Sequence, residues 1–198
     1  MNVRELLLLV VAVLGAGAGC SVFETREPAP PTSEEQCPWT IPTEPDTLLT
    51  NLETTVGCGL SGVVNYGRIF TEDFVFEADP ADVSDLEILL GADPFDGWNK
   101  TIEEDVFERI ATDVGSNGSL RLDLTNIEDT GGGEESDASF KADYTLTLKT
   151  SAVDSTVYEG AARFYMVNNV TWQINRWTDE RLGADVTSWG KLKGSNRL

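Results

Sequence analysis

Carboxylates are the side chains of this sequence most able to do chemistry, because the chain has 34 Asp and Glu residues and no His. The absence of His excludes a Ser-His-Asp triad, a Cys-His pair and an imidazole zinc site. An acid–base catalyst would instead need a carboxylate held in a pocket with a perturbed pKa. The two candidates in strand-like segments, Asp123 and Asp143, alternate out of phase with their apolar neighbours. We therefore expect both to face solvent, and the sequence predicts no catalytic residue.

The acidic residues also fail to form a metal-binding pattern. If Asp93 is the first position of a calcium loop, Glu104 falls at the last. Phe95, Gly97 and Trp98 then stand where the loop needs two oxygen ligands and its glycine. A second acidic group surrounds a glycine turn and consists of Glu128, Asp129, Glu134, Glu135 and Asp137. Such a group is typical of a solvated loop, so we expect no metal and no cofactor.

The overall charge excludes a further class of partner. Lys and Arg total 14, which leaves a net charge of −20. Nucleic-acid binding needs a cationic surface, so no nucleic-acid partner is expected. A hydrophobic content of 40% nevertheless indicates a folded domain, because disordered chains are far less apolar.

Aromatic and basic residues supply the candidate binding groups. Four aromatic residues could line a pocket for a small apolar ligand: Tyr144, Tyr158, Phe164 and Trp172. The alternative is that these rings belong to the core, as buried aromatic residues commonly do. Arg163 and Arg176 lie on adjacent predicted strands and could receive an anionic ligand or pair with surface acids.

The N-terminus has the layout of an export signal. A charged head precedes the apolar run Leu6–Leu14, and small residues follow up to Gly19. Residues 1–19 with Cys20 resemble a bacterial lipoprotein signal, although Gly17 departs from its usual Leu. The resemblance implies a lipid on Cys20 that anchors the exported chain to the membrane of the cell envelope. Ser21 at the next position implies the outer membrane if the cell has one. The alternative is ordinary cleavage near Gly19, with Cys20 incidental.

The two other cysteines are candidates for a disulfide. If lipid occupies Cys20, Cys37 and Cys58 remain, and export implies an oxidising compartment. We therefore predict a Cys37–Cys58 bridge, which would stabilise the fold by about 3 kcal/mol. Two free thiols are the alternative.

The remaining chain divides by composition into a tether, a domain and a tail. Residues 20–42 are rich in Pro and Glu and predict an extended tether. Residues 43–193 carry helical periods and then strand periods, and residues 194–198 form a short tail. Helices are expected to begin after Thr43, at Asp79-Pro80 and at a capping box that starts with Thr101. After Gly118 the period becomes two, which predicts long antiparallel strands and an α+β fold.

The order of these elements resembles the nuclear transport factor 2-like superfamily (also described as SnoaL-like or cystatin-like). The segments that carry the resemblance are 66–76, 99–110, 165–177 and 189–193. The family implies N-terminal helices packed on a strongly curved antiparallel sheet, in the shape of a cone. The signal, the tether and the missing catalytic constellation indicate a non-enzymatic envelope protein whose cone-shaped domain binds a ligand or partner. The alternatives are an isomerase- or cyclase-like enzyme with a carboxylate in the cone, and a structural homodimer through the sheet face.

Overall fold

The computed structural model describes residues 37–131, 136–151 and 153–197. The signal segment, Cys20 and Ser21 lie outside the described residues. None of the described helices combines the length and the hydrophobicity needed to span a bilayer.

The described residues form one five-stranded sheet in the order β1-β5-β4-β3-β2. The strands are β1 (Phe70–Glu77), β2 (Ser119–Asp129), β3 (Asp137–Lys149), β4 (Ser155–Asn168) and β5 (Trp172–Glu180). Strands β2 to β5 pair antiparallel, which confirms the prediction for the long strands. The expectation of a wholly antiparallel sheet was wrong for β1, which runs parallel to β5. Two helices and three strands separate β1 from β5 along the chain, so no hairpin sets the direction of this pair.

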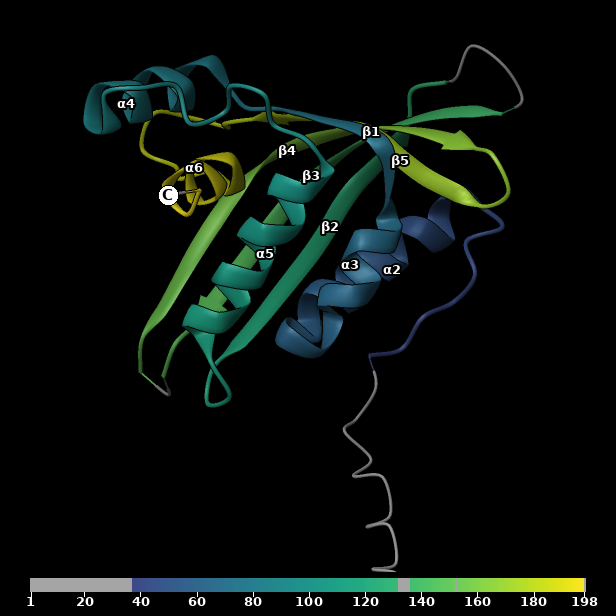
Figure 1. Ribbon diagram of the computed structural model, residues 1–198, viewed down its shortest axis with the longest axis horizontal. Coiled ribbons are helices and arrows are strands. Elements are labelled where there is room, and N and C mark those ends of the chain that lie inside the picture. The colour runs from purple at the N-terminus through teal and green to yellow at the C-terminus, as the bar shows by residue number, and fades with distance from the viewer. Residues whose placement is uncertain (1–36, 132–135, 152, 198) are drawn as a thin grey trace, which may run out of the picture. The chain divides into compact units, whose positions relative to one another are not determined.

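Helices cover one face of this sheet. They are α2 (Pro45–Gly57), α3 (Val63–Ile69), α4 (Pro80–Leu90), α5 (Lys100–Val114) and α6 (Trp189–Ser195), with a 3-10 turn, η1 (Gly59–Gly62). Figure 1 shows α2, α3 and α5 lying over the curved strands, while α6 lies beneath α4 and contacts β4 and β5. The core fills the space between these helices and the sheet.

The alternating pattern of each strand explains which face is covered. On β3 the side chains of Phe140, Ala142, Tyr144 and Leu146 are buried, and the residues between them are partly exposed. Side chains of successive strand residues point to opposite faces, so one apolar set faces the helices. The predicted period of two is confirmed, and with it the α+β class.

The predicted start of α4 is confirmed. The Ala81 backbone N–H donates to Asp79 Oδ1 at 2.8 Å, and a proline occupies the first helical position. Gly91 ends the helix with φ of 80°, in the left-handed region that glycine adopts without strain.

The other two predicted caps were wrong. Helix α2 begins after Glu44, and no side chain, Thr43 included, caps it. At α5 the cap is Asn99, whose Oδ1 accepts a hydrogen bond from the Ile102 N–H at 3.1 Å. Thr101 therefore lies inside the first turn. Asn is at least as good a cap as Thr, and it comes first along the chain.

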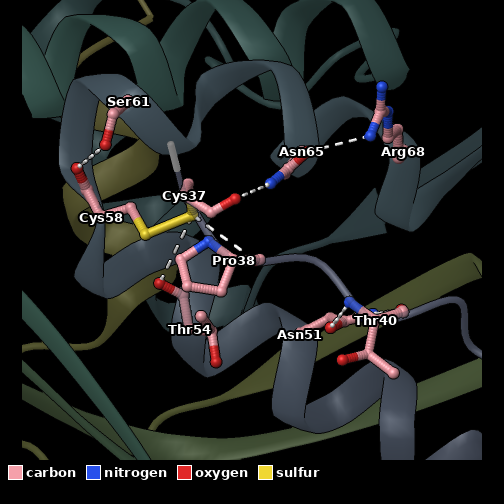
Figure 2. Close-up of a disulfide and its surroundings, with 9 residues drawn as sticks. All are labelled: Cys37, Pro38, Thr40, Asn51, Thr54, Cys58, Ser61, Asn65 and Arg68. Atoms are coloured by element: carbon pink, nitrogen blue, oxygen red, sulfur yellow. Dashed lines mark hydrogen bonds between the residues drawn. A yellow bond between two sulfur atoms is a disulfide. The ribbon is translucent and has the colours of Figure 1, made fainter. Parts of the chain in front are cut away.

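The predicted disulfide is present. Cys37 and Cys58 are bonded, with their Cα atoms 5.7 Å apart (Figure 2). Asn65 Nδ2 donates to the Cys37 carbonyl at 3.0 Å, and Asn51 exchanges hydrogen bonds with the Thr40 backbone at 2.6 and 3.2 Å. The last residues of the expected tether therefore lie along α2 and α3 and are held there by the bridge and by two asparagines.

Candidate functional site

Three charged residues from three elements are buried on the helix-covered face of the sheet. Glu103 on α5, Asp179 on β5 and Lys193 on α6 are each 1% exposed. Burying a charge is costly unless it is paired and hydrogen-bonded. A cluster of this kind needs a physical account, and it is the strongest candidate site in the described residues.

Glu103 is surrounded by donors. The Tyr66 hydroxyl donates to Oε1 at 2.6 Å, and the Trp98 indole N–H donates to Oε2 at 2.8 Å. Lys193 Nζ lies 2.7 Å from Oε1. Glu103 also lies near the N-terminus of α5, where the helix dipole favours a negative charge. These contacts hold the carboxyl group in one orientation. Burial raises the pKa of Tyr66, and the charge of Glu103 and its hydrogen bond with Tyr66 raise it further.

Lys193 projects from α6 into a group of aromatic rings. Its Nζ lies 3.5 Å from the ring centroid of Trp177, 4.0 Å from that of Phe76 and 4.9 Å from that of Trp189. Such contacts stabilise an ammonium group through the negative face of each ring. Burial nevertheless lowers the pKa of Lys193, and the charge of Glu103 opposes that shift.

Asp179 is the third member and the least satisfied. Its Oδ2 accepts a hydrogen bond from the Gly190 N–H at 2.9 Å, whereas Oδ1 has no hydrogen-bond partner among the described residues. Burial raises the pKa of Asp179 to about 7, and Lys193 and the Gly190 N–H oppose this shift. Tyr144 lies beside it, accepts the Trp189 N–H at 2.8 Å, and has its own pKa raised by burial and by Asp179.

A second polar group anchors the start of α6. Ser188 caps the helix by accepting the Lys191 N–H at 2.9 Å, and its hydroxyl donates to the fully buried Asp82. Arg181 Nη1 lies 3.3 Å from Asp82 Oδ1. Burial raises the pKa of Asp82, while Ser188 and Arg181 oppose this shift. The start of α6 is thereby tied to α4.

Two glycines allow α6 to lie this deep. A Cβ on Gly190 would lie 2.6 Å from Asp179 Oδ2. A Cβ on Gly194 would lie 2.5 Å from Leu86 Cδ1 and 2.6 Å from Phe95 Cζ. Any side chain at these positions would push the helix outward, and Lys193 with it.

The predicted pocket residues are spread over the core. Tyr144 and Phe164 lie near the buried cluster, where the Phe164 ring packs edge-on against Trp177 with centroids 5.0 Å apart. Trp172 lies at the opposite end of β5 from Asp179, and its backbone N–H donates to the Pro42 carbonyl at 2.9 Å. Tyr158 is half-buried at the edge of the core. The structure therefore brings together two of the four rings.

The other predicted groups lie on the outer face of the sheet. Asp123 pairs with Arg121 at 2.8 Å, and Asp143 accepts a hydrogen bond from Asn126 at 2.8 Å. Both aspartates are partly exposed, as predicted.

Arg163 and Arg176 line a groove on this outer face, with a volume of about 640 Å³. The Arg176 guanidinium carbon lies 3.8 Å from the Tyr165 ring centroid, and Nη1 lies 4.0 Å from Glu77 Oε1. The groove also contains Val75.

Sequence reasoning missed Glu103, Asp179 and Lys193. For Glu103 a signal exists, because it shares a helical stripe with the apolar residues Phe107, Ile110 and Val114. The capping-box pattern that starts with Thr101 instead predicted a place for Glu103 at the start of the helix, with no role in the core.

Comparison with known proteins identifies the fold but no family. No family model matches the sequence, and no curated protein matches it. A proposed aromatic ring hydroxylase from Novosphingobium aromaticivorans is similar in structure, with a TM-score of 0.54 and 19% identity over 74% of this chain and 92% of that one. The beta subunit of benzoate 1,2-dioxygenase from Burkholderia mallei has a TM-score of 0.50 and 16% identity, over 71% of this chain and 90% of that one. Naphthalene 1,2-dioxygenase, solved with indole bound, has a TM-score of 0.55 and 9% identity, over 73% of this chain and 80% of that one.

These similarities confirm the predicted fold. The protein is an α+β domain with the nuclear transport factor 2-like, or cystatin-like, cone architecture. Identities this low establish shared architecture alone, because one fold can carry many unrelated activities.

Proposed function

We propose that this protein is a lipid-anchored protein of the cell envelope whose domain binds a partner on its outer face and catalyses no reaction. The observation that carries the proposal is that α6 fills the helix-covered side of the sheet. The Cys20 signal motif supports the anchor, and the groove around Tyr165 supports the binding surface.

The filled interior argues against a small ligand inside the cone. The Trp189 ring packs edge-on against Trp177 with centroids 4.7 Å apart, and the Lys193 stem lies beside them. Because protein interiors are close-packed, a ligand would have to displace these side chains. Binding at the outer face needs no such displacement.

We infer that a partner would offer an anionic group to the two guanidinium groups of the groove. Arg163 and Arg176 share the groove with three acidic residues, which are Asp73, Glu77 and Asp137. Guanidinium groups bind carboxylates and phosphates through paired hydrogen bonds. The Arg176 side chain is 44% exposed and lies at the limit of ion-pair distance from Glu77, and its guanidinium group packs on the Tyr165 ring.

Cell fractionation tests the anchor. The wild-type chain should sediment with membranes, and Cys20→Ser should move it to the soluble fraction because the lipid is lost. The double variant Cys37→Ser/Cys58→Ser is the control and should stay with the membranes. A Cys20→Ser chain that remains membrane-bound would contradict the lipid anchor.

Photo-crosslinking in intact cells tests the groove. A photoreactive amino acid at position 165 should give an adduct that disappears when Arg163 and Arg176 are changed to Glu. The same amino acid at position 121, an exposed site on β2, is the control and should give no such adduct. An adduct of twice the chain mass would support the homodimer hypothesis instead. No adduct at position 165 would contradict binding there.

One observation favours the enzymatic alternative. Two buried carboxylates lie beside Tyr and Trp side chains, which is a setting for acid–base catalysis. Such catalysis would require α6 to leave and admit a substrate. Hydrogen exchange of the α6 amides tests this. Exchange only through global unfolding would exclude the enzyme, and exchange through a local opening would favour it.

A further inference from the structure

The contact between Lys193 and Glu103 differs from an ordinary buried ion pair. Lys193 Nζ lies 2.7 Å from Glu103 Oε1, and both side chains are 1% exposed. The two atoms nevertheless do not meet with hydrogen-bond geometry, and Nζ has no hydrogen-bond partner among the described residues. The nitrogen is therefore close to the carboxyl group without being aligned to donate to it.

We propose that Lys193 and Glu103 react with each other to form an intramolecular amide bond, which joins α6 covalently to α5. The reacting atoms are Nζ and the carboxyl carbon Cδ. The bond would be a modification of the folded protein by its own side chains.

The donors around Glu103 suit its role as the group attacked. Tyr66 donates to Oε1 at 2.6 Å and Trp98 donates to Oε2 at 2.8 Å. Attack on the carboxyl carbon places negative charge on oxygen, and fixed donors in a dry site stabilise that charge. Both donors come from buried side chains, so they are in place before the reaction begins.

The surroundings of Lys193 suit its role as the nucleophile. A lysine attacks only through its neutral amine, and burial away from water disfavours the charged form of Lys193 in spite of its contacts with Phe76, Trp177 and Trp189. The lowered pKa of Lys193 agrees with this geometry. Transfer of one proton from Nζ to the Glu103 carboxylate turns the ion pair into an amine and a carboxylic acid.

The reaction then balances without any other reagent. The lone pair of Nζ forms the C–N bond, and the C–O bond to one carboxyl oxygen breaks. One proton of Nζ moves to the leaving hydroxyl, so that water departs. Nothing is oxidised or reduced.

The fold supplies the proximity that the reaction needs. Two groups held in contact within one molecule react as if each were present at very high concentration. The site is shielded from water, which removes the reactant that would reverse the step. The same two side chains in an unfolded chain would not react.

Peptide mapping of the full-length chain tests the proposal. After denaturation and reduction, trypsin should release residues 101–109 joined to residues 192–197, with a combined mass lower by one water molecule. Cleavage after Lys193 should be blocked, because trypsin does not cut at an acylated lysine. Fragmentation should place the bond at Glu103, not at Glu104. If most of the material gives the two peptides separately, with cleavage after Lys193, the proposal is wrong and the contact is an ion pair.

Matched variants separate this bond from an accidental cross-link. Lys193→Met keeps an apolar stem without an amine and should abolish the joined peptide. Lys191→Arg changes a partly exposed lysine of the same helix, which pairs with Asp85, and should leave the joined peptide unchanged. Loss of the joined peptide in Lys191→Arg would contradict the assignment.

The wild-type mapping decides the bond itself, whatever the variants do.

Discussion

Gly160 on β4 stands directly opposite Tyr144 on β3, and the Tyr144 hydroxyl occupies the space that a side chain at position 160 would need. This pair lets the Tyr144 ring turn toward α6, where its oxygen accepts the Trp189 N–H. The position of α6 therefore depends on the absence of a side chain at position 160 of β4, a strand that α6 contacts.

Gly160→Ala should lower the free energy of unfolding by about 1 to 3 kcal/mol, because the added methyl overpacks the site and displaces Tyr144. Urea denaturation measures this change. Gly57→Ala is the control, since a Cβ there has open space and Ala favours a helix. A Gly160→Ala protein as stable as wild type would show that the ring moves without cost.

Gly194→Ala should displace α6 and shift the tryptophan fluorescence to the red, because Trp189 would become hydrated. The added methyl would press against Leu86 and Phe95. Gly183→Ala, where the nearest heavy atom is 3.9 Å away, should leave the spectrum unchanged. Identical spectra for both variants would contradict the close fit of α6 against α4.

Stability should fall as the pH rises from about 4 to about 7, and Asp179 should carry part of that slope. Its pKa is about 7 in the folded protein and near 4 in the unfolded chain, so over this range the folded state binds the extra proton. The free-energy cost of ionising Asp179 in the folded protein is absent below about pH 4 and complete above about pH 7. Lys193, Tyr144 and Asp82 face Asp179, and Asp82 contributes a slope of the same sign.

Asp179→Asn should therefore reduce the loss of stability between pH 5 and pH 8, measured by urea denaturation at both values. Asn keeps an oxygen that can accept the Gly190 N–H. The matched control is Asp123→Asn, at a partly exposed site of the outer face, which should leave the slope as in wild type. Equal slopes for wild type and Asp179→Asn would show that Asp179 is ionised at no cost.

Reduction of the Cys37–Cys58 bridge should lower the free energy of unfolding by about 3 kcal/mol, as expected for a loop of this length. Denaturation with and without reductant measures the loss, and Cys37→Ser/Cys58→Ser should reproduce it. Cys20→Ser should not. A reduced protein of unchanged stability would mean that Asn51 and Asn65 alone hold the segment before α2.

The parts of the fold that follow local rules could be predicted from the sequence. The strands follow from alternation over many residues, and the start of α4 follows from Asp79-Pro80. The parallel pairing of β1 could not be predicted, because strand direction across such a separation depends on how the whole chain packs. The buried cluster was missed for a related reason. Lys193 and Asp179 look like surface residues until the glycines of α6 bring that helix against β5.

The disulfide also decides how the domain responds to a pull on its N-terminal segment. Tension that arrives at Cys37 passes through the sulfur atoms to Cys58. The whole of α2 lies in the chain between these two cysteines and is bypassed. The helix therefore carries no load, and the first element that can yield is the turn after it, which packs against α5.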